Sequence, residues 1–131
     1  MGRELVGAEI VADRRPHLAT IDEQSLAAAQ AFETSFLFSE AVDYHVVPDE
    51  LGFYYDALCR LASAPGCSLL LGVRLADSVT EYMGGTWARP LQHFVEALAP
   101  LAYVKSHFVQ VGAAGGKSEG ITSATLEFRR A

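Results

Sequence analysis

Residues 51–62 read LGFYYDALCRLA, and residues 91–102 read LQHFVEALAPLA. The two stretches carry leucine, an aromatic residue, an acid and alanine at the same positions. In both, the apolar residues recur every three or four positions, which is the spacing of an amphipathic helix. The sequence therefore predicts two equivalent helices, each with one apolar side that must be buried.

Segments of strand-like composition flank both predicted helices. Residues 42–47 and 67–75 bracket the first helix, and residues 79–83 and 103–111 bracket the second. Two βαβ units joined by a hairpin predict an α+β fold with a ferredoxin-like split βαβ core over about residues 42–111. Both helices are then expected on one face of an antiparallel sheet.

Further elements are predicted before and after this core. Residues 4–12 have the composition of a strand, and Thr20-Ile21-Asp22-Glu23 has the pattern of a capping box, which predicts a helix from Ile21. Residues 34–38 suit a helix or a strand equally well. After a glycine-rich loop at residues 112–120, residues 121–129 alternate apolar and polar side chains and predict a C-terminal hairpin strand.

The length and composition indicate one soluble domain spanning residues 1–131. Half of the residues are hydrophobic and a fifth are charged, as in ordinary globular proteins. The sequence has no apolar run of the roughly 20 residues that a membrane span needs and no secretory leader pattern, so we expect a cytoplasmic protein. Its two cysteines and four histidines lack zinc-site spacing, and we predict neither a metal nor a cofactor.

The net charge of −6 is unevenly distributed along the chain. No lysine or arginine occurs from Pro16 to Cys59, a stretch that contains eight acidic residues. A surface of one sign repels nucleic acid and membrane phosphates and attracts basic partners. The alternative is an acidic face that only keeps the protein in solution.

A small set of polar residues could carry chemistry. If residues 42–47 form a strand with Val42, Tyr44 and Val46 against the helices, Asp43 and His45 point to the open face of the sheet. Arg74 would join them from the next strand, and His107 would do so if Lys105 and His107, rather than Ser106 and Gln110, face outward. An Asp-x-His pair beside an arginine can serve as a general base and an anion clamp. The alternative is that these are ordinary polar residues on an exposed face or a dimer interface.

Two functions are consistent with these patterns. The first is a small binding protein, of the immunity or inhibitor type, that uses its acidic face against a basic protein. Glu33, Asp49 and Asp56 would supply charge, and Tyr55 would be an aromatic anchor if its ring is exposed. The second is a small-molecule enzyme or ligand-binding protein of the dimeric ferredoxin-like type. Its pocket would lie on the open sheet face, with Asp43, His45, Arg74 and His107.

Overall fold

The computed structural model describes residues 21–31, 33–111 and 120–131. Within these ranges the chain forms a mixed α+β fold with a four-stranded sheet and three α-helices. The elements run in the order α2 (Glu23–Gln30), β1 (Phe36–Ser39), η2 (Asp43–His45), η3 (Pro48–Glu50), α3 (Leu51–Leu61), β2 (Ser68–Leu75), β3 (Thr80–Tyr82), β4 (Thr86–Ala88), α4 (Leu91–Ala97), β5 (Ala102–Val111) and β6 (Thr122–Arg129). Both η elements are single turns of 3-10 helix.

The strands of the main sheet lie in the order β1-β2-β6-β5. β1 is parallel to β2, and β6 is antiparallel to both of its neighbours, β2 and β5. β1, β2 and β5 therefore run in one direction, with the reversed strand β6 inserted between β2 and β5. The sheet is mixed, whereas the sequence predicted a wholly antiparallel one. The parallel strands β1 and β2 are direct neighbours and are not split by a third strand, so the ferredoxin-like arrangement is not confirmed.

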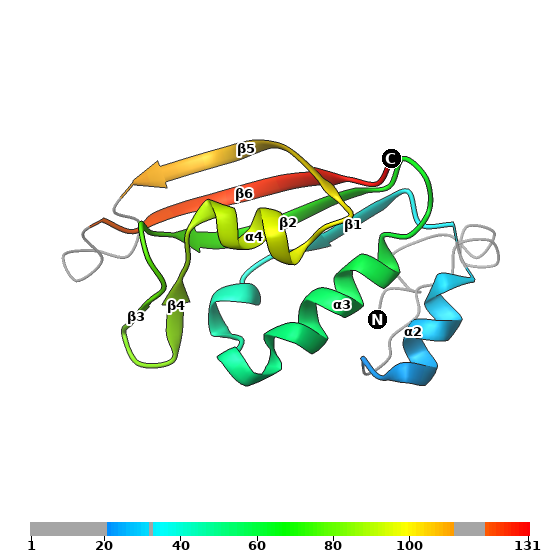
Figure 1. Cartoon of the computed structure of the whole chain (residues 1–131), viewed down its shortest axis with the longest axis horizontal. Helices are drawn as coiled ribbons and strands as arrows, with labels where there is room; N and C mark the ends of the chain where they lie inside the picture. The colour runs from blue at the N-terminus through cyan, green and yellow to red at the C-terminus, as the bar shows by residue number, and fades with distance from the viewer. Residues whose placement is uncertain (1–20, 32, 112–119) are drawn as a thin grey trace, which may run out of the picture.

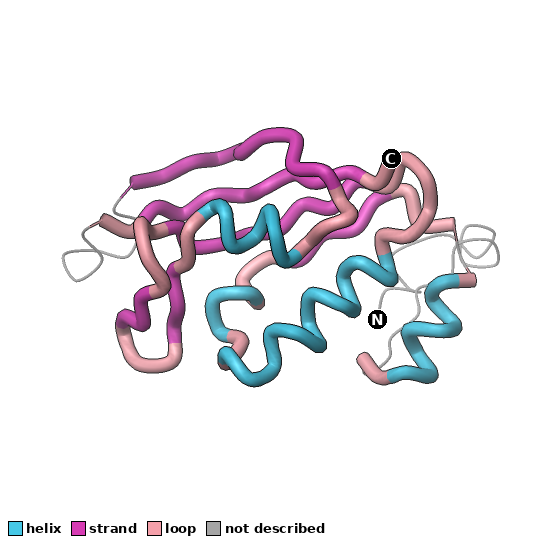
Figure 2. Tube along the Cα trace, viewed as in Figure 1, coloured by secondary structure: helices cyan, strands magenta, loops and turns pink. Residues whose placement is uncertain are grey.

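The helices cover one face of this sheet, as predicted. Figure 1 shows α3 and α4 on the same side of the four strands, and Figure 2 shows the strands as one layer with the helices below it. The core between the layers consists of apolar side chains from α3, α4, β2 and β6. It includes Leu58, Ala62, Phe94, Leu98, Leu69, Leu71, Val73, Ala124, Leu126 and Phe128.

The alternation within β2 and β6 sets the two faces of the sheet. Leu69 pairs with Phe128 and Leu71 with Leu126, and all four side chains are fully buried under the helices. Arg74 has the opposite parity and pairs with Ser123. These assignments follow from the two-residue period of a strand, and both were predicted from the sequence.

Several predicted elements are confirmed with small shifts of their ends. The first helix of the repeat was expected over residues 51–62 and is Leu51–Leu61. The second helix ends at Ala97, and an end about one turn short of residue 102 is expected from the proline at position 100. Residues 34–38, which suited helix or strand equally, contribute β1. The predicted strand at residues 4–12 and most of the glycine-rich loop lie outside the described residues.

The N-terminal capping box uses other residues than predicted. Asp22 is the N-cap of α2, and its Oδ1 accepts a hydrogen bond from the Ser25 backbone N–H at 2.8 Å. The Asp22 N–H in turn donates to Ser25 Oγ at 2.9 Å. The helix therefore begins two residues later than the pattern based on Thr20 indicated, because Asp22 and Ser25 form a reciprocal capping box of their own.

The largest correction concerns residues 42–47, which form no strand. The chain leaves β1 through Ala41, whose φ is 59°, and turns into η2, where Asp43 and Tyr44 are buried. The alternation of apolar and polar residues in 42–47 is also compatible with this turn, because the polar residue Asp43 finds its partners inside the protein. In the second half of the predicted duplication, β3 pairs only with β4, in a separate two-stranded sheet.

Candidate functional site

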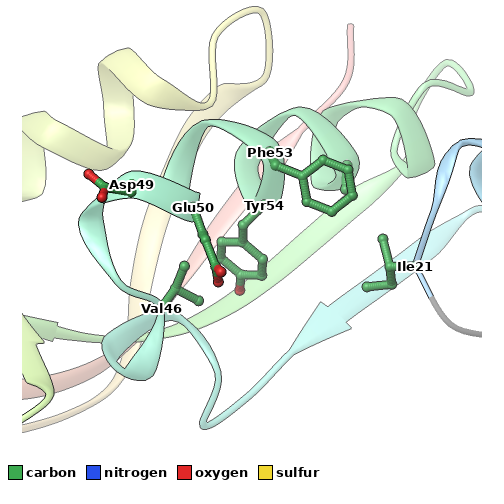
Figure 3. Close-up of a pocket in the computed structure, with 7 residues that line it drawn as sticks. Ile21, Val46, Asp49, Glu50, Phe53 and Tyr54 are labelled. Atoms are coloured by element: carbon green, nitrogen blue, oxygen red, sulfur yellow. The ribbon is translucent and has the colours of Figure 1, made fainter.

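A surface groove lies where the chain turns from β1 into α3. Its cavity volume is about 430 Å³, and it is open to solvent. We call it the acidic groove. Its lining residues are Ile21, Val46, Asp49, Glu50, Phe53, Tyr54 and Ala57. Figure 3 shows that α3 and the turn before it supply most of these side chains, with Ile21 facing them from the start of α2.

Two acidic residues bring negative charge to the groove. Asp49 and Glu50 belong to η3, which leads directly into α3, and both are exposed. Asp49 precedes the helix, but neither it nor another described side chain caps the start of α3. Among the ion pairs of the described residues, neither carboxylate has a cation. Both remain available to a ligand.

The rest of the groove is largely apolar. Phe53 is 49% exposed and Ile21 is 53% exposed, and both border the hollow. Tyr54 forms part of the wall, and its hydroxyl is 2.8 Å from Ser39 Oγ at the end of β1. Burial raises the pKa of Tyr54 to about 12, so the groove presents a neutral hydroxyl there. The groove thus combines an apolar surface with two carboxylates that have no cationic partner within the described parts of the chain.

A buried polar cluster holds the turn that carries the groove. Arg89 and Asp43 form an ion pair with 3.3 Å between Nη1 and Oδ1, and each side chain is 1% exposed. Arg89 also donates to the carbonyl oxygens of Asp43 and Val46, at 3.3 and 3.2 Å. The second carboxylate oxygen of Asp43 accepts from the Tyr55 hydroxyl at 2.7 Å. η2 is thereby attached to α3 and to the segment between β4 and α4.

His93 completes this cluster from α4. Its Nε2 is 3.0 Å from the Tyr55 hydroxyl oxygen. Because the single Tyr55 proton is donated to Asp43, Nε2 must carry the proton in this second hydrogen bond. Burial, followed by the nearby Arg89 charge, lowers the pKa of His93, so the neutral ring is favoured. Burial raises the pKa of Asp43, which Tyr55 and Arg89 partly offset by favouring the carboxylate.

The predicted enzyme residues are not brought together. Asp43 faces the interior, and His45 is exposed, with its ring centroid 4.6 Å from that of Tyr44. The hypothesis that both point to the open face is wrong because it assumed a strand at residues 42–47. Arg74 does lie on the open face, with its guanidinium 4.1 Å from the Tyr44 ring centroid and Nη1 donating to Ser123 Oγ at 2.7 Å.

His107 is on the open face as well. It lies on β5 opposite Thr125, and its Nε2 is 2.8 Å from Glu127 Oε1. The sequence left open which side of this strand faces outward. Lys105 and His107 do so, whereas Ser106 pairs with the core residue Leu126. Shifts in register along β5 make this alternation difficult to infer from sequence.

The predicted partner-binding residues have different environments. Glu33 and Asp56 are exposed, and Asp56 is 3.8 Å from Arg60, which also pairs with Glu23 at 2.8 Å. Asp49 lines the acidic groove. Tyr55 is only 6% exposed and is held by Asp43 and His93, so its ring is not presented to a partner.

Sequence reasoning missed three residues that shape this region. Phe53 is the exposed aromatic side chain of the groove, Glu50 is its second acid, and Arg89 is the partner of Asp43. The helical periodicity of this segment places Leu51, Tyr54, Leu58 and Leu61 on one side of the helix. Phe53 lies outside this apolar stripe, which was the available signal that its ring is exposed. No comparable signal pointed to Arg89, because 46 positions separate it from Asp43.

Comparison with protein-family models and with curated proteins gave no match. In the described parts of the chain, no group of three or more histidine, cysteine, aspartate and glutamate side chains could hold a metal ion. None of the helices in those parts is long and apolar enough to cross a membrane.

Proposed function

We propose that this protein binds a basic protein partner through the acidic groove. The observation that carries the proposal is that one groove contains two exposed carboxylates, Asp49 and Glu50, beside the exposed ring of Phe53. Among the described residues, neither carboxylate has a cationic partner. A lysine or arginine side chain suits such a site, because its aliphatic stem packs on apolar surface while its charge meets a carboxylate. An immunity or inhibitor protein directed against a basic target is the class we favour.

The charge around the groove supports this proposal. Its seven lining residues include two acids and no base. The chain from Pro16 to Cys59, which contributes the whole lining, has no lysine or arginine. Glu40 and Asp56 add exposed acids on the same part of the chain. A field of one sign raises the rate at which oppositely charged partners associate and gives binding a strong salt dependence.

A charge reversal tests the proposal directly. The Asp49→Lys/Glu50→Lys variant is compared with wild type for binding to a lysine-rich peptide by isothermal titration calorimetry. We expect the affinity to fall by at least about tenfold at low salt, because repulsion replaces attraction at the groove. Asp77→Lys/Glu96→Lys is the matched control, since it makes the same change in net charge at exposed acids outside the groove.

Each outcome of this experiment is informative. If both double variants lose affinity equally, the peptide responds to net charge alone and the acidic groove is not the binding site. A Phe53→Ala variant tests the apolar part of the site, and it should weaken binding with little change in stability because the ring is half exposed. Undiminished affinity of Phe53→Ala would remove the aromatic anchor from the proposal.

A second candidate function uses the open sheet face. Arg74 and His107 share that face, each with a hydrogen-bond partner on β6. In a face-to-face homodimer of the ferredoxin-like type, these groups from two copies would enclose a pocket for a small acidic ligand. Asp43 and His45 do not join them, so this candidate has lost two of its four residues. Sedimentation as a monomer at high concentration would eliminate it.

A further inference from the structure

The strand β1 lies at the edge of the main sheet. Among the described residues it pairs only with β2, so its other edge offers backbone N–H and C=O groups for pairing. Natural proteins usually protect such an edge with lysine, proline or a bulge. β1 reads FLFS and has none of these features. A short, apolar edge strand without lysine, proline or a bulge is a template for a strand from another polypeptide.

The face of the sheet next to this edge is apolar and exposed. Phe36 is 55% exposed and Phe38 is 62% exposed, and Phe38 pairs in register with Leu70 of β2. The described helices cover only the other face of the sheet, so these two rings have no cover from them. The exposed phenylalanines indicate that this corner of the sheet is completed by something that packs on them.

The free edge and the acidic groove are adjacent. Leu37 and Ser39 of β1 point toward the helix-covered face, where Leu37 packs on the core and Ser39 contacts the groove residue Tyr54. Figure 3 shows β1 running beside Tyr54 and Ile21. A strand added to β1 would therefore have one face toward the groove and the other toward Phe36 and Phe38.

We propose that the basic partner binds as an extended segment that adds a strand to the free edge of β1. This inference rests on the proposed function and specifies the mode of binding. Because side chains alternate along a strand, the segment must alternate too. Its basic residues face the carboxylates of Asp49 and Glu50, and its apolar residues pack on Phe36 and Phe38. A partner motif of alternating lysine or arginine and valine or isoleucine fits this edge.

Two synthetic peptides of identical composition test this mode. One alternates lysine and valine, and the other places all lysines before all valines. Both are titrated into wild type, Asp49→Lys/Glu50→Lys and Phe36→Lys/Phe38→Lys. We expect wild type to bind the alternating peptide at least about tenfold more tightly than the block peptide, because only the alternating peptide satisfies both faces and the strand hydrogen bonds. The phenylalanine variant should lose this preference, and its two added lysines should lower its affinity for both lysine-containing peptides.

Hydrogen exchange supplies a direct measurement of strand addition. The amides of residues 33–40 should exchange more slowly when the alternating peptide is bound, because new inter-strand hydrogen bonds protect them. The block peptide should leave their exchange unchanged. Exposed positions 36 and 38 tolerate lysine without loss of core packing, and circular dichroism of the variant checks its fold.

The two proposals fail in different ways. Equal affinity of wild type for both peptides, with weaker binding by Asp49→Lys/Glu50→Lys, would overturn strand addition and leave the acidic groove as a charge-based site. Absence of binding by either peptide would overturn both proposals. A wild-type dimer that Phe36→Lys/Phe38→Lys converts to a monomer, with no peptide protection of residues 33–40, would assign the edge to a second copy and overturn strand addition.

Discussion

Two consecutive single-turn helices follow β1, and their acidic residues have opposite environments. In η2, Asp43 is fully buried, ion-paired with Arg89 and hydrogen-bonded to Tyr55. In η3, Asp49 and Glu50 are exposed and lack a cationic partner among the described residues. A buried carboxylate needs such partners because loss of water costs several kcal/mol. An exposed one keeps its water, and its charge can be offered to another molecule.

Within eight residues of the chain, η2 belongs to the structural scaffold and η3 belongs to the proposed binding site. The Asp43 cluster attaches the turn to α3 and α4, and the acids of η3 are held outward on that fixed support. A binding site gains affinity when its residues are held in place before the ligand arrives. We therefore expect changes in the cluster to affect stability first, and changes in η3 to affect binding without affecting stability.

Loss of Arg89 should have the largest effect. Arg89→Ala leaves Asp43 buried without its counter-charge and removes two hydrogen bonds to backbone carbonyls. Removal of one partner of a buried pair typically costs about 3–5 kcal/mol in the free energy of unfolding. Urea denaturation followed by circular dichroism measures this loss.

Arg60→Ala provides the matched control for this prediction. Arg60 pairs with Glu23, whose side chain is 77% exposed, and such surface pairs contribute up to about 1 kcal/mol. If the two alanine variants lost similar stability, the distinction between the buried cluster and the exposed acids would fail. A loss of stability in the Asp49→Lys/Glu50→Lys variant would also weaken the distinction between the buried cluster and the exposed acids.

The second prediction uses pH to examine the buried cluster. The folded-state pKa of His93 is lower than its ordinary value of 6.5, so the unfolded chain binds more protons below that pH. Stability should therefore fall as the pH drops from 6.5 toward the lowered pKa, by at most about 1.4 kcal/mol per pH unit. Tyr55, Arg89 and Glu96 are the groups that surround the ring or shift its pKa.

His93→Gln tests whether this histidine is the cause. Glutamine can still donate a hydrogen bond to Tyr55 but does not titrate, so the thermal midpoint of the variant should change less over this range. The pKa of Glu127 is lowered from 4.5 by its hydrogen bond with His107, and stability from that carboxylate is lost only at lower pH. A pH dependence that the variant retains in full would place its origin outside the buried cluster.

The sequence predicted the parts of the fold that depend on periodicity. The stripe of α3, the apolar run of β2 and the alternation of β6 each require burial on a definite side, and each lies as expected. The η2 turn could not be predicted in this way. Val42 to Val47 alternates well enough for a strand, and the partners that make burial of Asp43 acceptable, Arg89 and Tyr55, lie outside that segment.

The candidate site was predictable in its charge but not in its shape. The absence of lysine and arginine from Pro16 to Cys59 predicted an acidic surface, and Asp49 and Glu50 are two of the seven residues that line the groove. Tyr55 and Phe53 are two residues apart on α3, which turns them to different sides of the helix. Sequence reasoning chose Tyr55 as the anchor, but Tyr55 is the buried one, because its hydroxyl is needed by Asp43.

The smallest expected effect on stability concerns Glu40, an exposed residue that precedes η2 and η3. Its carboxylate lies over the backbone of Gly72 in β2, where an added Cβ would contact it. Gly72→Ala should change stability by less than about 1 kcal/mol, since alanine suits a strand better than glycine and the end of an exposed glutamate can move aside. Chemical denaturation of Gly72→Ala, Glu40→Ala and the double variant measures the coupling of the two positions. A coupling well above 1 kcal/mol would show that Glu40 is held firmly on β2, and the scaffold would then extend back from η2 to Glu40.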